Sequence, residues 1–85
     1  MRAGLHVEDA EGHGAVLVAK MGWSVPPPVG ARWSCCRRGD MPTAEVVGVE
    51  WAGLEGEADA WVQMNADRRL VGHLTSAHGF DPLER

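Results

Sequence analysis

The segment from Asn65 to Ala77 carries the strongest signal for a helix in this chain of 85 residues. Asn65 is a favoured N-cap residue, and Asp67 then places a carboxylate where it opposes the positive end of the helix dipole. One face of the following segment carries apolar residues at helical spacing, namely Leu70, Val71, Leu74 and Ala77. This face is expected to pack against the rest of the domain.

The residues that follow predict where this helix ends. Gly79 suits the left-handed C′ position, Phe80 is placed for the hydrophobic contact that accompanies such an end, and Pro82 prevents continuation. The sequence therefore predicts a C-terminal helix over residues 65–79 and a tail over residues 80–85.

The preceding residues, 1–64, are predicted to be rich in β-strands. Extended segments are predicted at Gly4–Asp9, Ala15–Trp23, Arg32–Cys36, Thr43–Trp51 and Ala58–Met64. The first two form a hairpin whose second strand, an unbroken apolar run, is expected to be central and whose first strand is expected at an edge. Residues 58–64 also fit the start of a helix, but strand is favoured because Asn65 supplies a separate helix start.

The strand Thr43–Trp51 has the clearest alternation. Glu45, Val47, Val49 and Trp51 fall on one side of it, whereas Val46, Gly48 and Glu50 fall on the other. The prolines at 26, 27 and 28 predict a stiff connection over residues 24–30, since proline has no backbone donor for a sheet.

Length limits the chain to one domain, because so short a chain cannot divide its core. Hydrophobic residues make up 45% and charged residues 24%, which is ordinary globular composition. We expect an α+β domain, with an antiparallel sheet of four or five strands, flat or curled into an SH3-like partial barrel, and one C-terminal helix packed on it.

The charge balance and the apolar runs exclude some classes of partner. A formal net charge of −4 removes the general attraction to phosphate, so nucleic-acid binding is not expected. No signal sequence or membrane-length apolar run is present. We therefore expect no membrane binding, and we expect a cytoplasmic location. Adjacent Cys35 and Cys36 are expected to be free thiols in that reducing compartment.

No motif of nucleophilic, phosphate-binding or dinucleotide chemistry is present, and the chain is therefore not expected to be an enzyme. Four tryptophans are many for a core this small. One helix is expected to cover only one face of the sheet, so the second face stays open. Trp23, Trp33, Trp51 and Trp61 are thus candidates either for the core or for a surface that binds a protein partner.

Two histidines, His73 and His78, stand at the end of the predicted helix. Either they are structural, with His78 at the helix end, or they bind a metal. The segment resembles the H-x4-H half of a C2H2 zinc finger, which implies Zn²⁺ as cofactor. The matching cysteine pair is absent at the equivalent distance, where Glu57 and Ala60 stand.

Cys35 and Cys36 are the only thiols available to complete such a site with His73 and His78. Because neighbours on a strand point to opposite faces, we expect that at most one of these cysteines joins the histidines. The main expectation is therefore a domain without a cofactor, and a zinc-stabilised module that recognises protein or nucleic acid is the alternative.

The segment HLTSAHGFDP, from His73 to Pro82, also resembles a segment of small uncharacterised accessory proteins of phages that infect actinobacteria. The resemblance implies a phage accessory protein that binds a host or phage protein, or a minor virion component. Together with the tryptophans it favours a protein–protein interaction module, and a homodimer through the same sheet face is equally compatible.

Overall fold

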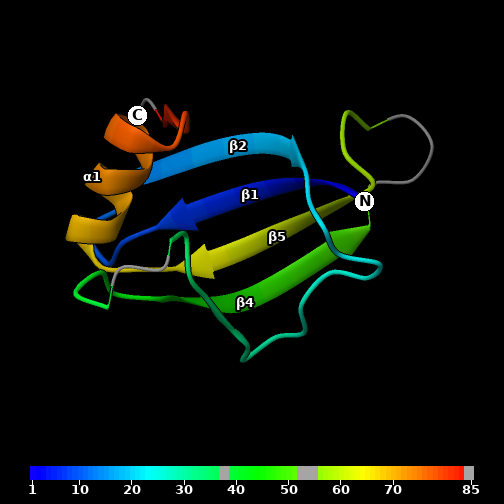
Figure 1. The fold of residues 1–85 in the computed structure, drawn as a ribbon, viewed down its shortest axis with the longest axis horizontal. Coiled ribbons are helices and arrows are strands. Elements are labelled where there is room, and N and C mark those ends of the chain that lie inside the picture. The colour runs from blue at the N-terminus through cyan, green and yellow to red at the C-terminus, as the bar shows by residue number, and fades with distance from the viewer. Residues whose placement is uncertain (37–38, 52–55, 84–85) are drawn as a thin grey trace.

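Four long strands lie side by side, and one helix covers one end of the sheet in the computed structural model (Figure 1). Residues 1–36, 39–51 and 56–83 are described. The elements in chain order are β1 (Arg2–Glu8), β2 (Gly14–Lys20), β3 (Arg32–Trp33), β4 (Ala44–Trp51), β5 (Ala60–Asn65), α1 (Arg68–Ala77) and β6 (Asp81–Pro82).

The sheet is mixed rather than antiparallel. Its six strands have the order β3-β4-β5-β1-β2-β6, and β1 runs parallel to β5 while every other pair is antiparallel. The predicted α+β class with one C-terminal helix is confirmed, and the curled sheet forms a half-barrel. The prediction of four or five antiparallel strands is wrong. The direction of β1 relative to β5 could not be predicted, because side-chain alternation is the same for parallel and antiparallel strands.

The order of the strands also corrects their predicted positions. β1 lies between β5 and β2, so the first strand is central, whereas β2 has only the two-residue β6 on its outer side. The hairpin of β1 and β2 is confirmed, with Leu5 opposite Leu17. Its turn is closed by Asp9, whose Oδ1 accepts hydrogen bonds from the backbone N–H groups of Glu11 and His13, both at 2.9 Å.

The core lies between α1 and one face of the sheet. It consists of alternate residues of the long strands together with the apolar face of the helix: Leu5, Val7, Ala15, Ala44, Val46, Val62, Met64, Leu70, Val71, Leu74 and Phe80. The choice of strand over helix for residues 58–64 is confirmed from Ala60 onward, with Ala60, Val62 and Met64 pointing inward, whereas Ala58 precedes the strand. Ala77, predicted on the apolar face, is exposed.

A register shift between Val46 and Gly48 interrupts the alternation of β4. Val46 is buried in the core, and Val49, three residues later, packs against the same core, so the two residues that were predicted on opposite sides share one face. A β-bulge inserts one extra residue in this way and re-aims the residues after it.

The helix begins later than predicted. Asn65 is the last residue of β5, and the N-cap is Asp67, whose Oδ1 accepts a hydrogen bond of 2.9 Å from the backbone N–H of Leu70. Asn65 and Asp67 are both good N-cap residues, and the longer β5 decides between them. At the other end Gly79 has the predicted positive φ, 73°, and Phe80 is buried.

Replacing Asp67 with alanine is expected to lower the free energy of unfolding by about 1 kcal/mol, because the N-terminal turn loses its capping acceptor. Chemical denaturation followed by circular dichroism measures this change. The matched replacement Asn65→Ala, at the exposed end of β5, is expected to cost less than about 0.5 kcal/mol. A larger loss for Asn65→Ala than for Asp67→Ala would contradict the assignment of the cap.

Two short strands lie at the edges of the sheet. β3 ends at Trp33, three residues before the predicted end at Cys36. The predicted tail contains β6, in which Pro82 pairs with Ala15, and the backbone N–H of Leu83 donates to the carbonyl of Gly14 at 3.0 Å. Proline is tolerated there because an edge strand needs no donor on its outer side.

Candidate metal centre

Four side chains with metal-binding atoms converge where the loop after β3 meets the end of α1. They are Cys35, Cys36, His73 and His78, and their ligand atoms all lie within 4.8 Å of one another. All four residues are half-buried. The sequence singled out these same residues, but the structure brings all four together, whereas only one cysteine was expected to join the histidines.

The distances inside this cluster are close to those of a tetrahedral zinc site. The two sulfur atoms lie 3.6 Å apart, and the Nε2 atoms of His73 and His78 lie 3.2 Å apart. Around zinc, usual bond lengths and tetrahedral angles place two sulfurs about 3.8 Å and two imidazole nitrogens about 3.3 Å apart. The sulfur pair and the nitrogen pair each therefore have the spacing that one ion requires.

The end of the helix explains how both histidines reach one point. On a regular helix a residue five positions later is rotated by about 140°, so the two side chains would point in different directions. His78 is the C-cap and has left the helical conformation, with φ −122° and ψ 13°. The two imidazole rings consequently meet edge to face, with centroids 4.9 Å apart.

The residues after His78 hold this conformation in place. The backbone N–H groups of His78 and Phe80 both donate to the carbonyl of Leu74, at 3.1 and 3.3 Å. Gly79 supplies the positive φ between them, which a side chain would disfavour. The ring of Phe80 then packs against that of Trp33, with centroids 6.3 Å apart, and so joins the end of β3 to the end of α1.

The position of the cysteines corrects the expectation that only one of them faces the histidines. Cys35 and Cys36 lie in a bend beyond the end of β3, so the alternation of a strand does not apply to them. The hydroxyl of Ser34 donates to the carbonyl of Cys36 at 2.8 Å, which shapes this bend. Both are free thiols, and they present their sulfurs to the same side.

The surroundings of Cys35 are not those of a nucleophilic thiol. Burial, together with the neighbouring Cys36 thiol, raises the pKa of the Cys35 thiol to about 11, so in the metal-free protein it is protonated at neutral pH. A catalytic cysteine requires the opposite shift. A divalent ion held here would stabilise the thiolate form of Cys35, so its binding at neutral pH would release a proton.

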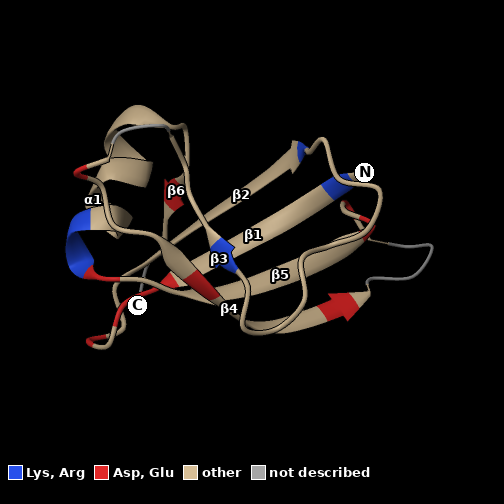
Figure 2. Cartoon of the chain, turned by 60° about the horizontal axis from the view of Figure 1, so that its bottom comes forward, with Lys and Arg blue, Asp and Glu red and all other residues tan. Residues whose placement is uncertain are grey.

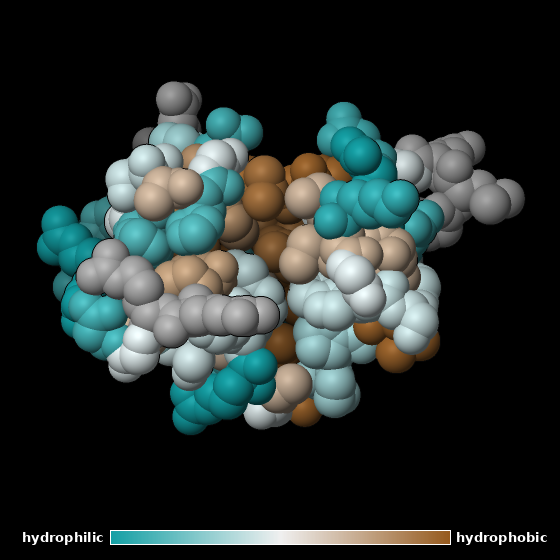
Figure 3. All heavy atoms as spheres, viewed as in Figure 1, coloured by the Kyte–Doolittle hydropathy of each residue, from teal (hydrophilic) through white to brown (hydrophobic). Residues whose placement is uncertain are grey.

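The four tryptophans do not form one surface. Trp23 and Trp33 are half-buried and pack against the core, and Trp51, at the end of β4, is 61% exposed. Trp61 lies on the opposite face of the sheet, over Gly4. Seen from the side of the helix, hydrophobic side chains gather over the middle of the sheet, between more hydrophilic groups (Figure 3).

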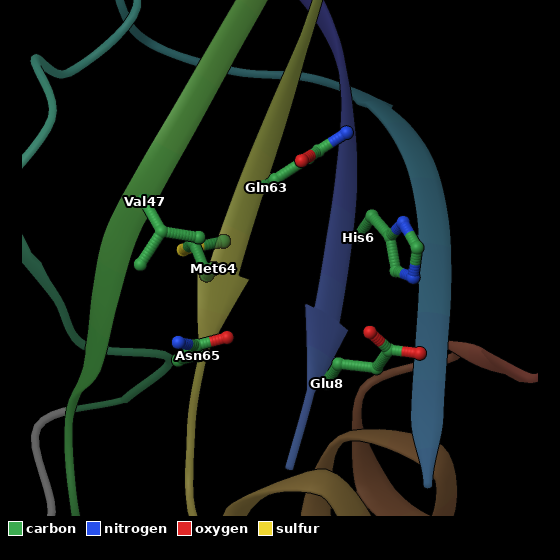
Figure 4. Close-up of a pocket in the computed structure, with 6 residues that line it drawn as sticks. All are labelled: His6, Glu8, Val47, Gln63, Met64 and Asn65. Carbon is green, nitrogen blue, oxygen red and sulfur yellow. The ribbon is translucent and has the colours of Figure 1, made fainter. Parts of the chain in front are cut away.

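Sequence reasoning missed a small hollow on the sheet face opposite the helix, with a volume of about 130 Å³ (Figure 4). His6 and Glu8 lie side by side there, since alternate residues of β1 share a face. Among the described residues, Nε2 of His6 has no hydrogen-bond partner. The alternation of these two polar residues with the apolar Val7 between them was the available signal.

The comparisons with protein-family models, curated proteins and solved structures found no match to this chain. Within the described ranges, no helix has the length and apolar character required to span a membrane. Lys and Arg residues stand at separate places along the described chain, including the start of α1, β3, the start of β1 and the end of β2 (Figure 2). The metal-ligand cluster is therefore the feature from which a function is best argued.

Proposed function

We propose that this chain is a small zinc-stabilised binding module in which Cys35, Cys36, His73 and His78 hold one structural Zn²⁺. The observation that carries this proposal is the convergence of two thiols and two imidazoles within 4.8 Å. A set of two sulfur and two nitrogen ligands is typical of structural zinc, and four protein ligands leave no open position for a substrate.

The ion would act as a cross-link between segments that are far apart in the sequence. Cys35 and Cys36 belong to the loop that connects β3 with β4, whereas His73 and His78 belong to α1 and its C-cap. Because such an ion would bind the folded arrangement of these side chains and not the unfolded chain, its binding would add to the stability of the fold and fix the loop against the helix. A chain of this size has a small core, and small domains commonly depend on a metal for added stability.

The module would bind a protein partner through apolar side chains that stay exposed. Val25, Val29, Val47 and Trp51 are the large hydrophobic residues with the greatest exposure among the described residues. Of these, Trp51 is the strongest candidate for an anchor, because tryptophan dominates the energetics of many protein interfaces.

Metal analysis tests the proposal directly. Protein purified without added metal is expected to contain one zinc per chain, measured by plasma mass spectrometry. Replacing zinc with Co²⁺ is expected to give the intense visible bands of a tetrahedral site and a thiolate charge-transfer band in the near ultraviolet. The variants Cys35→Ser, Cys36→Ser, His73→Gln and His78→Gln should each weaken binding more than about 100-fold, above the loss seen for outer-shell partners.

The matched control is His13→Gln. His13 is exposed in the turn between β1 and β2, beside Asp9, and lies outside the cluster. This variant is expected to bind zinc as tightly as the native chain. Protein without bound metal under these conditions, or full zinc content in the variants at His73 and Cys35, would refute the proposal.

A further inference from the structure

The side chain of Trp61 lies flat on the sheet face that faces away from α1. A Cβ atom built on Gly4 would come within 3.0 Å of Cε3, Cδ2 and Cζ3, three consecutive atoms of the Trp61 ring, at nearly equal distances. Such distances place the face of the indole, rather than its edge, against Gly4. The other face of the ring consequently points away from the sheet.

A hollow of about 340 Å³ adjoins this ring at the β2 side of the sheet. It is lined by Val16, Leu17, Val18, Glu57, Trp61 and Asp81. The pairing of the strands explains why these residues meet: Val18 is opposite Gly4, under the indole, and Val16 is opposite Asp81 of β6. The hollow thus joins an apolar floor and the indole of Trp61 to two carboxylates.

The two charged residues that line this hollow are both acidic. Glu57 and Asp81 are exposed, and none of the described lining residues is basic. Within the described part of the chain, neither carboxylate takes part in an ion pair or a side-chain hydrogen bond. The nearby Arg2 instead donates from Nε to the backbone carbonyl of Glu57, at 3.0 Å.

A cation fits these surroundings better than any other group. The face of an indole attracts positive charge through the ring quadrupole, and carboxylates beside it add charge-assisted hydrogen bonds. An apolar floor favours a cation that carries an alkyl stem, as basic side chains do. Arginine suits the site better than lysine, because its planar guanidinium stacks on the ring and still donates to a carboxylate in its plane.

We propose that this hollow binds an arginine side chain presented by a basic segment of a protein partner, with the guanidinium on Trp61 and its N–H groups directed to Glu57 and Asp81. The formal net charge of −4 favours the approach of such a segment. The hollow lies on the sheet face opposite the core, away from the metal-ligand cluster. Binding there does not depend on the zinc proposal.

An acetylated and amidated peptide of four arginines is the probe. The indole N–H signals of the four tryptophans are followed by two-dimensional NMR of ¹⁵N-labelled protein during titration. The Trp61 signal is expected to shift most. The double variant Glu57→Gln/Asp81→Asn, which keeps the size of both exposed side chains, is expected to weaken binding about tenfold.

Two further variants keep the test decisive. Glu11→Gln removes one exposed carboxylate far from the hollow, in the turn between β1 and β2, and is expected to change the affinity less than about twofold. Trp61→Leu keeps an apolar side chain over Gly4 without the ring and is expected to weaken binding about tenfold. Metal content, measured in parallel, is expected to be the same in all these variants.

Several results would overturn the proposal. The first is a titration in which the peptide leaves the Trp61 signal unmoved, or shifts it no more than the signals of the other tryptophans. The second is equal affinity for the native chain and the double variant. A third is a peptide of four lysines that binds as tightly as the arginine peptide, which would refute the assignment of a guanidinium.

Discussion

Removing zinc with a chelator is expected to lower the free energy of unfolding of this domain by about 4 kcal/mol when free zinc had been at 1,000 times its dissociation constant. The loss arises because the ion binds the folded cluster and not the unfolded chain. In a domain of this size it corresponds to a fall in Tm of about 15 to 30 °C. Thermal denaturation followed by circular dichroism, with zinc and with chelator, measures the effect.

The variant His73→Gln separates the effect of the ion from the effect of the side chain. Its Tm is expected to be the same with and without zinc, and close to that of the metal-free native chain. His13→Gln, in contrast, is expected to keep the full zinc-dependent increase. A native chain whose Tm does not respond to the chelator, although zinc was bound, would show that the ion does not stabilise the fold.

Replacing Leu74 with alanine is expected to lower the free energy of unfolding by about 3 kcal/mol. Leu74 is fully buried and packs α1 on the sheet, so the truncation removes apolar contacts and leaves a cavity. Its carbonyl also accepts the hydrogen bonds that shape the turn carrying His78. Urea denaturation of the metal-free protein measures the change without a contribution from zinc.

Ser76→Ala is the matched control on the same helix. Ser76 is exposed, and its replacement is expected to change the free energy of unfolding by less than about 0.5 kcal/mol. A loss below about 1 kcal/mol for Leu74→Ala would contradict the placement of this side chain at the centre of the core.

The helix and the long strands could be predicted because their signals are local. The alternation of β4 and β5 is visible in residues a few positions apart, and so is the apolar spacing of α1. The signal for the end of the helix, Gly79, is local in the same sense. The start of the helix was misplaced because Asn65 and Asp67 are equivalent by propensity. Only the pairing of β5 with β1 and β4 extends the strand to Asn65 and leaves Asp67 as the cap.

The direction and order of the strands could not be predicted in the same way. Leu5 and Val7 bury the same face whether β1 pairs with its neighbour in parallel or antiparallel fashion. The bulge in β4 was missed for a related reason, since an inserted residue shows only against the partner strand. No strand was predicted in the tail over residues 80–85, yet the edge of β2 offers Asp81 and Pro82 a partner.

The metal-ligand cluster was predictable as a set of residue types and not as an arrangement. His73 and His78 carried a recognisable spacing, and Cys35 and Cys36 were the only thiols. Assigning both cysteines to a strand divided them between two faces. The actual end of β3 at Trp33 releases them into a bend, where both sulfurs face the histidines.

The number of tryptophans was known from the sequence, but their positions in the fold were not. Their number left two alternatives open, the core or an exposed surface, and Trp51 is exposed whereas Trp23 and Trp33 pack against the core. The sequence contained no sign that Trp61 lies over Gly4, because these two residues meet only through the parallel pairing of β1 and β5. The hollow beside Trp61 therefore depends on a contact between distant parts of the chain.

The sequence by itself determined the C-terminal helix and its end, the alternation of the strands, and the presence of two thiols and of the His73 and His78 imidazoles. These properties follow from propensities and periodicities that act over a few residues. The tertiary structure alone decided the parallel pair, the position of the cysteines and the convergence of all four side chains. Their physical cause is the pairing and packing of segments far apart in the chain, which local preferences do not encode.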